Sequence, residues 1–146
     1  MKKLLCLALL LAAVSCASAQ GQFGLGIKVG VVNGINGKYV NSSGNATECE
    51  VAWGVNDRFF FQTTYNFMLK NLAERKPGSI EFYAGPGIFI RSPERDDSRF
   101  GLAGNFGVGW LWDRHVEFMM EMSPQIGMSP ITRLDFTAGL GFRFLF

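Results

Sequence analysis

Apolar and polar residues alternate along the chain after residue 20, and the alternation is longest in residues 132–146. One parity of this segment carries Leu134, Phe136, Ala138, Leu140, Phe142, Phe144 and Phe146, and the other carries Arg133, Asp135, Thr137, Gly139, Gly141, Arg143 and Leu145. Successive side chains of a β-strand point to opposite faces of a sheet. The pattern predicts a strand with one apolar face, and its length and period are typical of a strand that crosses a bilayer, which needs about ten residues.

The same alternation recurs in seven earlier segments, which are 22–31, 35–40, 46–55, 59–70, 80–91, 100–112 and 116–128. Short connections separate them, the first being Asn33-Gly34, a dipeptide typical of tight hairpin turns. Pro86 is expected to cause a bulge or kink because proline cannot donate a ladder hydrogen bond, and Pro124 interrupts a later strand. We therefore predict an all-β fold: an eight-stranded antiparallel up-and-down transmembrane β-barrel in which 132–146 closes against 22–31.

The N-terminus has the features of a cleavable signal peptide. Two lysines follow Met1, an apolar run extends over 4–14, and Ala17-Ser18-Ala19 provides the small residues of a cleavage site. The run is shorter than the roughly 18 apolar residues of a membrane helix. We expect residues 1–19 to be a signal peptide, with Ala17 and Ala19 at the cleavage site, and 20–146 to be the barrel domain. Lipidation at Cys16 is an alternative, since residues 13–16 loosely fit a lipoprotein signal.

Loss of this segment would leave a chain without net charge. The 14 basic residues fall to 12 when Lys2 and Lys3 are removed, which equals the number of acidic residues. No basic field for nucleic acid remains, so no nucleic-acid partner is expected. Of the three cysteines only Cys49 is retained, which excludes an intramolecular disulfide. Stability must then come from another source, such as closure of a barrel.

Most charged residues of the strands share the face opposite the large apolar side chains. They are Lys28, Lys38, Lys70, Arg91, Arg133 and Arg143, with Glu48, Glu50, Glu81, Glu117, Glu121 and Asp135. Lys or Arg facing lipid near the bilayer midplane would cost about 2–4 kcal/mol, so this face is expected to point into the lumen. Unpaired buried charges are costly, which favours a network of ion pairs that plugs the barrel. A narrow or gated pore is the alternative, because many inward glycines would leave room for water.

The sequence offers little for catalysis or for binding a cofactor. His115, the single histidine, lies in a predicted turn without the serine and acid that a hydrolase would place beside it. Asp96 and Asp97 with Glu94 could hold a cation, although a solvated loop accounts for them better. Cys49 and the stripe of Met120, Met122 and Met128 fit a lipid-facing surface. We therefore predict no enzyme, no cofactor and no metal site.

The aromatic residues divide into two groups by their predicted height on the strands. Phe23, Phe67, Phe82, Trp110, Trp112, Phe144 and Phe146 fall near one rim, whereas Trp53, Phe59, Phe61, Phe100 and Phe136 fall near the other. Two aromatic girdles are typical of membrane barrels. A third possibility, a secreted soluble barrel that binds an apolar ligand, would instead need its apolar face inward.

Several short stretches resemble a family of small bacterial outer-membrane β-barrel proteins. They are Phe23-Gly24-Leu25-Gly26-Ile27, Gly37-Lys38-Tyr39, Tyr83-Ala84-Gly85-Pro86-Gly87, Asp97-Ser98-Arg99-Phe100-Gly101, Glu117-Phe118 with Glu121 and Pro124, and Ala138 to Phe146. The family is similar in architecture to the transmembrane domain of outer membrane protein A and has no settled activity.

This resemblance implies a location and partners rather than a catalytic residue. It implies an outer-membrane location, contact with outer-membrane lipid and a monomeric state. It also implies a final strand whose aromatic residues Phe142, Phe144 and Phe146 are the insertion signal read by the barrel assembly machinery. Residues 92–99, the most charged connection, are the one candidate for a surface loop with a partner.

Overall fold

The structure is a computed structural model that describes residues 21–53, 57–69, 76–93, 98–129 and 132–146. It contains the strands β1 (Gln22–Gly30), β2 (Asn33–Val40), β3 (Ala46–Trp53), β4 (Asp57–Met68), β5 (Ile80–Pro93), β6 (Arg99–Asp113), β7 (Val116–Ser129) and β8 (Arg133–Leu145). Within these ranges no helix is long and apolar enough to cross a membrane. The prediction of signal cleavage at Ala17 and Ala19, with its alternative at Cys16, lies outside the described residues.

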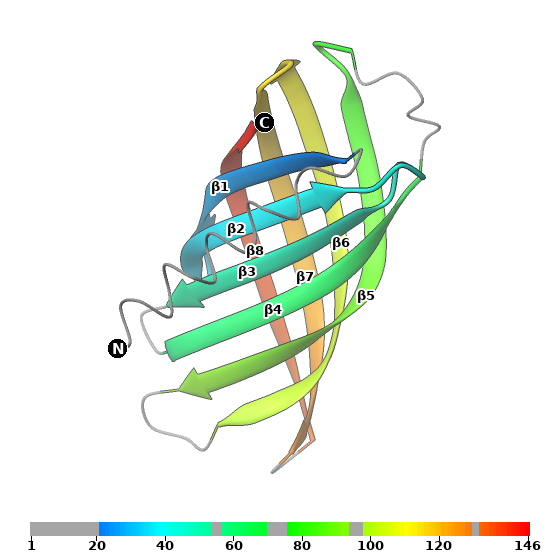
Figure 1. The fold of residues 1–146 in the computed structure, drawn as a ribbon. Helices are drawn as coiled ribbons and strands as arrows, with labels where there is room; N and C mark the ends of the chain where they lie inside the picture. The colour runs from blue at the N-terminus through cyan, green and yellow to red at the C-terminus, as the bar shows by residue number, and fades with distance from the viewer. Residues whose placement is uncertain (1–20, 54–56, 70–75, 94–97, 130–131) are drawn as a thin grey trace, which may run out of the picture.

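The strands form one closed antiparallel barrel (Figure 1). Each strand pairs with the next in sequence, and β8 pairs with β1 from Gly24↔Leu145 to Gly30↔Gly139. The backbone N–H of Phe146 extends this seam by donating to the carbonyl oxygen of Phe23 at 2.7 Å. The predicted fold class is therefore confirmed, including closure of the last strand against the first. We call the end of the barrel where β1 begins and β8 ends the terminal end.

The predicted first hairpin turn is wrong. Asn33 and Gly34 are the first residues of β2, and the chain bends at Val31 and Val32 instead. The side-chain oxygen of Asn33 accepts a hydrogen bond from the Gly30 N–H at 3.1 Å, which stabilises the bend from within the strand. A Cβ at Gly34 would collide with the Val51 carbonyl oxygen of β3, so this glycine serves strand packing and not a turn.

The bulge expected at Pro86 is also absent. Pro86 pairs with Gly104 of β6, and the register between β4 and β5 is the same on its two sides, from Thr64↔Gly87 to Phe67↔Ala84. A neighbouring glycine explains the fit, since a Cβ at Gly85 would overlap the Tyr65 carbonyl. Because Gly85 has no side chain, β4 can lie close to β5 here without a shift in the register of the two strands.

The two faces of the barrel reverse the usual arrangement of a soluble protein. Large apolar side chains such as Ile27, Phe106, Met120 and Leu140 are exposed on the outer surface, whereas most buried side chains are polar or charged. A soluble domain buries its apolar residues and exposes its charges, whereas a membrane barrel can do the opposite because lipid covers its exterior. The outer surface is therefore suited to lipid.

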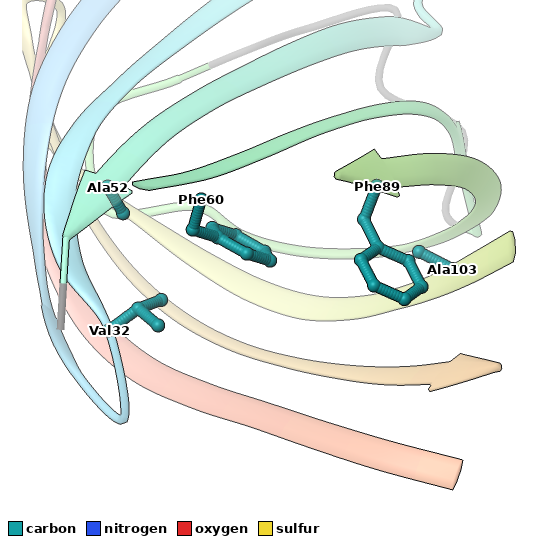
Figure 2. Packing of buried hydrophobic residues seen from close by; sticks show 5 residues of the cluster. All are labelled: Val32, Ala52, Phe60, Phe89 and Ala103. Atoms are coloured by element: carbon teal, nitrogen blue, oxygen red, sulfur yellow. The ribbon is translucent and has the colours of Figure 1, made fainter. Parts of the chain in front are cut away.

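Buried apolar residues form a layer at the end of the lumen opposite the terminal end. Val32, Ala52, Phe60, Phe89 and Ala103 make up this cluster, which draws on the β1–β2 bend and on strands β3 to β6. Figure 2 shows the rings of Phe60 and Phe89 inside the ribbon, with Ala103 beside Phe89. A second group of buried apolar residues lies toward the terminal end of the barrel. Its members are Val40, Ala46, Leu111 and Leu145. Most of the buried polar residues of the lumen thus lie between two groups of apolar residues.

Candidate functional site

The centre of the lumen is organised around Arg143 of β8. Its guanidinium lies 3.1 Å from a carboxylate oxygen of Glu117, 3.4 Å from one of Glu48 and 3.7 Å from one of Glu121. It also donates to the side-chain oxygen of Asn36 and, from Nη2, to Met119 Sδ at 2.8 Å. The arginine is fully buried. One cation of the last strand therefore binds side chains from β2, β3 and β7.

Two lysines connect further strands across the barrel. Lys28 of β1 lies 2.7 Å from Glu50 of β3 and 3.0 Å from Glu121 of β7. Lys38 of β2 lies 2.8 Å from Glu117 of β7 and 3.7 Å from Glu81 of β5. We call Lys28, Lys38, Arg143, Glu48, Glu50, Glu81, Glu117 and Glu121 the lumen network. Its three cations and five carboxylates are all buried.

Tyr83 is an additional member of this site that the charge pattern alone does not identify. Its hydroxyl donates to Glu121 Oε1 at 2.7 Å, and the Lys38 ammonium lies 5.1 Å from the centre of its ring. The ring therefore contributes a hydrogen bond to one charge and a cation–π contact to another. The alternation of the sequence indicates only that Tyr83 lies on the inward face of its strand, and not that it contacts these charges.

A chain of neutral side chains continues the site on the β4 side. Gln125 Nε2 donates to Gln62 Oε1 at 2.7 Å, and Gln62 Nε2 donates to Ser123 Oγ at 3.1 Å. Ser123 Oγ in turn donates to Asn105 Oδ1 at 3.0 Å, and Asn105 Nδ2 donates to Asn66 Oδ1 at 3.3 Å. Such contacts satisfy polar groups that would otherwise be buried without partners. Candidate residues chosen for charge alone miss this part of the site.

The remaining candidates that the structure describes, Arg91, Arg133 and Asp135, lie toward the end of the barrel opposite the terminal end. Arg91 is buried near the apolar layer, with its Cζ 5.2 Å from the centre of the Phe60 ring. Asp135 binds Arg99 at 3.0 Å and Arg133 at 3.3 Å near the end opposite the terminal end. The Arg133 side chain is 60% exposed, so its predicted place in the lumen is wrong: its strand position is close to the rim. Lys70 lies outside the described residues.

A small cavity opens beside the network. It is lined by Asn36, Glu48, Glu50, Gln62, Thr64, Asn105 and Glu121, and its volume is about 10 Å³. This volume is close to what one water molecule requires. The cavity is therefore large enough for a single small occupant.

Side chains cover several of the inward glycines that were expected to leave room for water. The Tyr83 ring lies over Gly107 and the Met119 side chain lies over Gly141, each so close that an added Cβ would collide with it. A Cβ at Gly109 would lie 2.6 Å from Glu117 Oε1. At these positions the glycines accommodate large neighbours.

The other residues that the sequence suggests for catalysis or binding contact neighbouring side chains or the backbone. His115, in the β6–β7 turn, places Nδ1 3.0 Å from the Leu145 carbonyl oxygen and stacks on Phe144 with 5.6 Å between ring centres. Cys49 is exposed on the outer face, with Sγ 3.4 Å from Thr63 Oγ1. In the described part of the chain, no three His, Cys, Asp or Glu side chains converge as ligands for a metal ion. Residues 94–97 of the acidic loop lie outside the described residues.

Aromatic residues of β6, β7, β8 and β1 form a belt at the terminal end on the outside of this part of the barrel. Phe118 lies 5.9 Å from Trp110, 5.9 Å from Trp112 and 5.7 Å from Phe142. Phe146 lies 5.2 Å from Phe144 and 6.1 Å from Phe23, which connects β8 to β1. The three residues of the predicted insertion signal, Phe142, Phe144 and Phe146, therefore all belong to this belt. Aromatic belts mark the interface between lipid and water in membrane barrels.

The fold and its surfaces define an integral membrane β-barrel of the outer-membrane type, because a closed antiparallel barrel with an apolar exterior satisfies every backbone group within lipid. The soluble alternative is wrong, since its apolar face would have to point inward.

Solved structures support this class. The N-terminal β-barrel domain of OprF from Pseudomonas aeruginosa is similar with a TM-score of 0.60 and 13% sequence identity, over 88% of this chain and 98% of that chain. Neisserial surface protein A is similar with a TM-score of 0.56 and 9% identity, over 85% of this chain and 93% of that chain. No family model and no curated protein matches the sequence. The resemblance to small outer-membrane barrels is thus confirmed for the fold, which supports the predicted location in the outer membrane.

Proposed function

We propose that the protein is a non-catalytic, integral outer-membrane barrel with a structural or surface-exposed role, and that charged side chains plug its lumen. The observation that carries this proposal is the lumen network. Lys38 reaches from β2 to Glu81 on β5 and Glu117 on β7, so its contacts span the barrel instead of joining neighbouring strands. A solute would have to separate these buried ion pairs to pass.

Two further features support a closed lumen. The apolar layer that contains Phe60 and Phe89 lies between the network and one end of the barrel. The side chains over Gly107 and Gly141 fill space that water would need for a continuous path. Charged groups enclosed in this way interact strongly, because the surrounding dielectric is low.

The proposed partners follow from the outer surface and from the family resemblance. We infer that outer-membrane lipid covers the exposed apolar side chains and that the barrel assembly machinery inserts the chain. We further propose a monomer without a nucleic-acid partner. Replacement of signal residues Ala17 and Ala19 by larger side chains should retain the unprocessed chain, which mass determination of the exported protein would test.

A narrow pore for small ions or solutes is the second candidate function. The cavity beside Glu48 and Glu50 favours it, because it shows that the lumen is not filled everywhere. Its volume of about 10 Å³ is nevertheless enough for only about one water molecule.

Conductance in planar lipid bilayers distinguishes the two functions. We expect the purified protein to give no steady current above that of protein-free detergent, with a known porin as the positive control. Lys38→Ala, which removes the links from β2 to β5 and to β7, should admit current if the network is the barrier. Steady steps from the unaltered protein, with an ion selectivity that changes in Glu48→Gln, would establish the pore.

A further inference from the structure

The small cavity of the lumen contains unsatisfied oxygen atoms. Glu48 Oε1 and Glu50 Oε1 are buried and accept no hydrogen bond from any described residue. Both residues line the cavity, and they are only 3% and 4% exposed. A buried polar atom without a partner is unfavourable, and a charged one more so. The two oxygens therefore indicate that the cavity holds something that the protein atoms do not supply.

The basic residues beside these glutamates do not fully satisfy them. Lys28 binds the other oxygen of Glu50, Oε2, at 2.7 Å. Arg143 lies 3.4 Å from Glu48 Oε1, beyond the distance of a charge-assisted hydrogen bond, because its guanidinium is shared with Asn36, Glu117 and Met119. Each glutamate thus retains an oxygen available to another cation.

Three carboxylates of the lumen network, those of Glu48, Glu50 and Glu121, line this one cavity. Buried carboxylates that lie close together are unfavourable unless a cation or a proton lies between them.

We propose that the cavity binds one alkali cation, Na⁺ or K⁺, through Glu48 and Glu50. Thr64, which also lines the cavity, carries a neutral hydroxyl oxygen that can coordinate the ion. The side-chain oxygens of Asn36, Gln62 and Asn105 each accept a hydrogen bond already and can offer the ion only their second lone pair. Mg²⁺ usually retains several waters, for which this cavity has no room, and the affinity of a Ca²⁺ site rises with the charge of its ligands, part of which Lys28 and Arg143 already neutralise here. A single alkali ion matches the size of the cavity and lowers the negative charge. The proposal does not depend on whether the barrel conducts.

The test is the stability of the purified, detergent-solubilised protein in different chloride salts at constant ionic strength. Urea unfolding is compared in KCl, in NaCl and in the chloride of N-methyl-D-glucamine, whose cation is too large for the cavity, all with chelator. We expect K⁺ or Na⁺ to lower the unfolding equilibrium constant progressively with its concentration, by about elevenfold at ten times the dissociation constant. A fourth series with CaCl₂ and no chelator shows whether a divalent ion binds instead.

Matched variants locate the effect. Glu48→Gln should abolish the preference for alkali cations, whereas Glu81→Gln, which removes the same charge from the network away from the cavity, should retain it. Thr64→Val removes a neutral oxygen from the cavity wall and should raise the cation concentration that lowers the unfolding equilibrium constant about tenfold. This variant provides a test even if Glu48→Gln does not fold.

Four outcomes would overturn the proposal. Equal stability in all chloride salts would mean that water or protons occupy the cavity. Stabilisation by Ca²⁺ alone would assign a divalent site. Equal loss of the preference in Glu48→Gln and Glu81→Gln would reflect the charge of the whole network, and an unchanged response in both Glu48→Gln and Thr64→Val would place the ion elsewhere.

Discussion

The phenol ring of Tyr83 occupies the space in which a side chain at position 107 would stand. The two residues are register partners on β5 and β6, and a Cβ on Gly107 would collide with the ring. The Tyr83 hydroxyl donates to Glu121 of β7 at 2.7 Å, so the ring is fixed at its far end as well. In a barrel of eight strands, where side chains just fill the interior, an aromatic ring needs such a bare neighbour.

Gly107→Val should therefore destabilise the barrel by about 1–3 kcal/mol, the usual cost of overpacking a well-packed interior. The measurement is urea unfolding of the detergent-solubilised protein, followed by tryptophan fluorescence. Gly37→Ala is the matched control, since a Cβ there meets only the Cys49 carbonyl oxygen at 3.9 Å. Equal losses in both variants would show that strand glycines matter for a reason other than the Tyr83 ring.

Arg143→Ala should destabilise the protein far more than Arg133→Ala. The first change leaves Glu48, Glu117 and Glu121 without a shared buried cation, and breaking such a buried pair costs about 3–5 kcal/mol. The second removes an exposed side chain at the rim, where substitutions usually change stability by less than about 0.5 kcal/mol. Unfolding in urea measures both, and similar values for the two variants would argue against a central role of Arg143.

Phe146→Ser should lower the amount of protein assembled in the outer membrane severalfold. The expectation rests on the resemblance to barrels whose final aromatic residues are recognised during insertion, and Phe146 also contacts Phe23 and Phe144 in the aromatic belt. Quantification in isolated outer membranes, after normalisation to total synthesis, provides the measurement. Phe136→Ser, an exposed aromatic of the same strand at its other end, is the control. Unchanged levels of the Phe146 variant would remove the support for the insertion signal.

The tryptophans should report contact with lipid. Trp53, Trp110 and Trp112 are all exposed on the outer surface, and Trp53 lies toward the opposite end from the other two. Variants that keep one tryptophan and replace the others with phenylalanine should be quenched by brominated lipids, most strongly when bromine is near the headgroups. Fluorescence that does not respond to brominated lipid would contradict the membrane-facing surface.

A folded barrel should also migrate differently from its heat-denatured form in detergent gel electrophoresis. Hydrogen bonds around the closed ring from β1 to β8 make the folded form compact in detergent until it is heated. A folded chain that remained soluble in plain buffer would argue against the outer-membrane class, since the exposed surface carries many large apolar residues.

The sequence predicts the faces of the strands well because a period of two residues is a local property. Phe60 interrupts the apolar pattern of its strand, yet the same parity correctly places it in the lumen with Gln62. Odd or even position in a strand predicts which face a residue occupies but not how far it lies from the rim of the barrel. Arg133 and Arg143 therefore have very different surroundings, although they lie on the same face of β8. Which charges meet depends on the stagger of all eight strands, and this is a property of the closed barrel.

Strand ends and neutral contacts were the least predictable features. The sequence pattern places Arg99 in a connection, but β6 begins at this residue and Arg99 binds Asp135 at 3.0 Å. The amide and hydroxyl chain from Gln125 to Asn66 also depends on residues that are distant in sequence. An uncharged polar residue has no residue of opposite charge to pair with, so the sequence does not indicate which side chain it will contact.

The position of Arg143 on β8 has a consequence for folding. Arg143 contacts Asn36 on β2 and Glu48 on β3, which lie beyond the seam that β8 forms with β1. The same strand therefore supplies both the last row of backbone hydrogen bonds, against β1, and a central cation of the lumen. Formation of the seam and formation of these ion pairs are coupled for this reason, so a change that weakens one is expected to weaken the other.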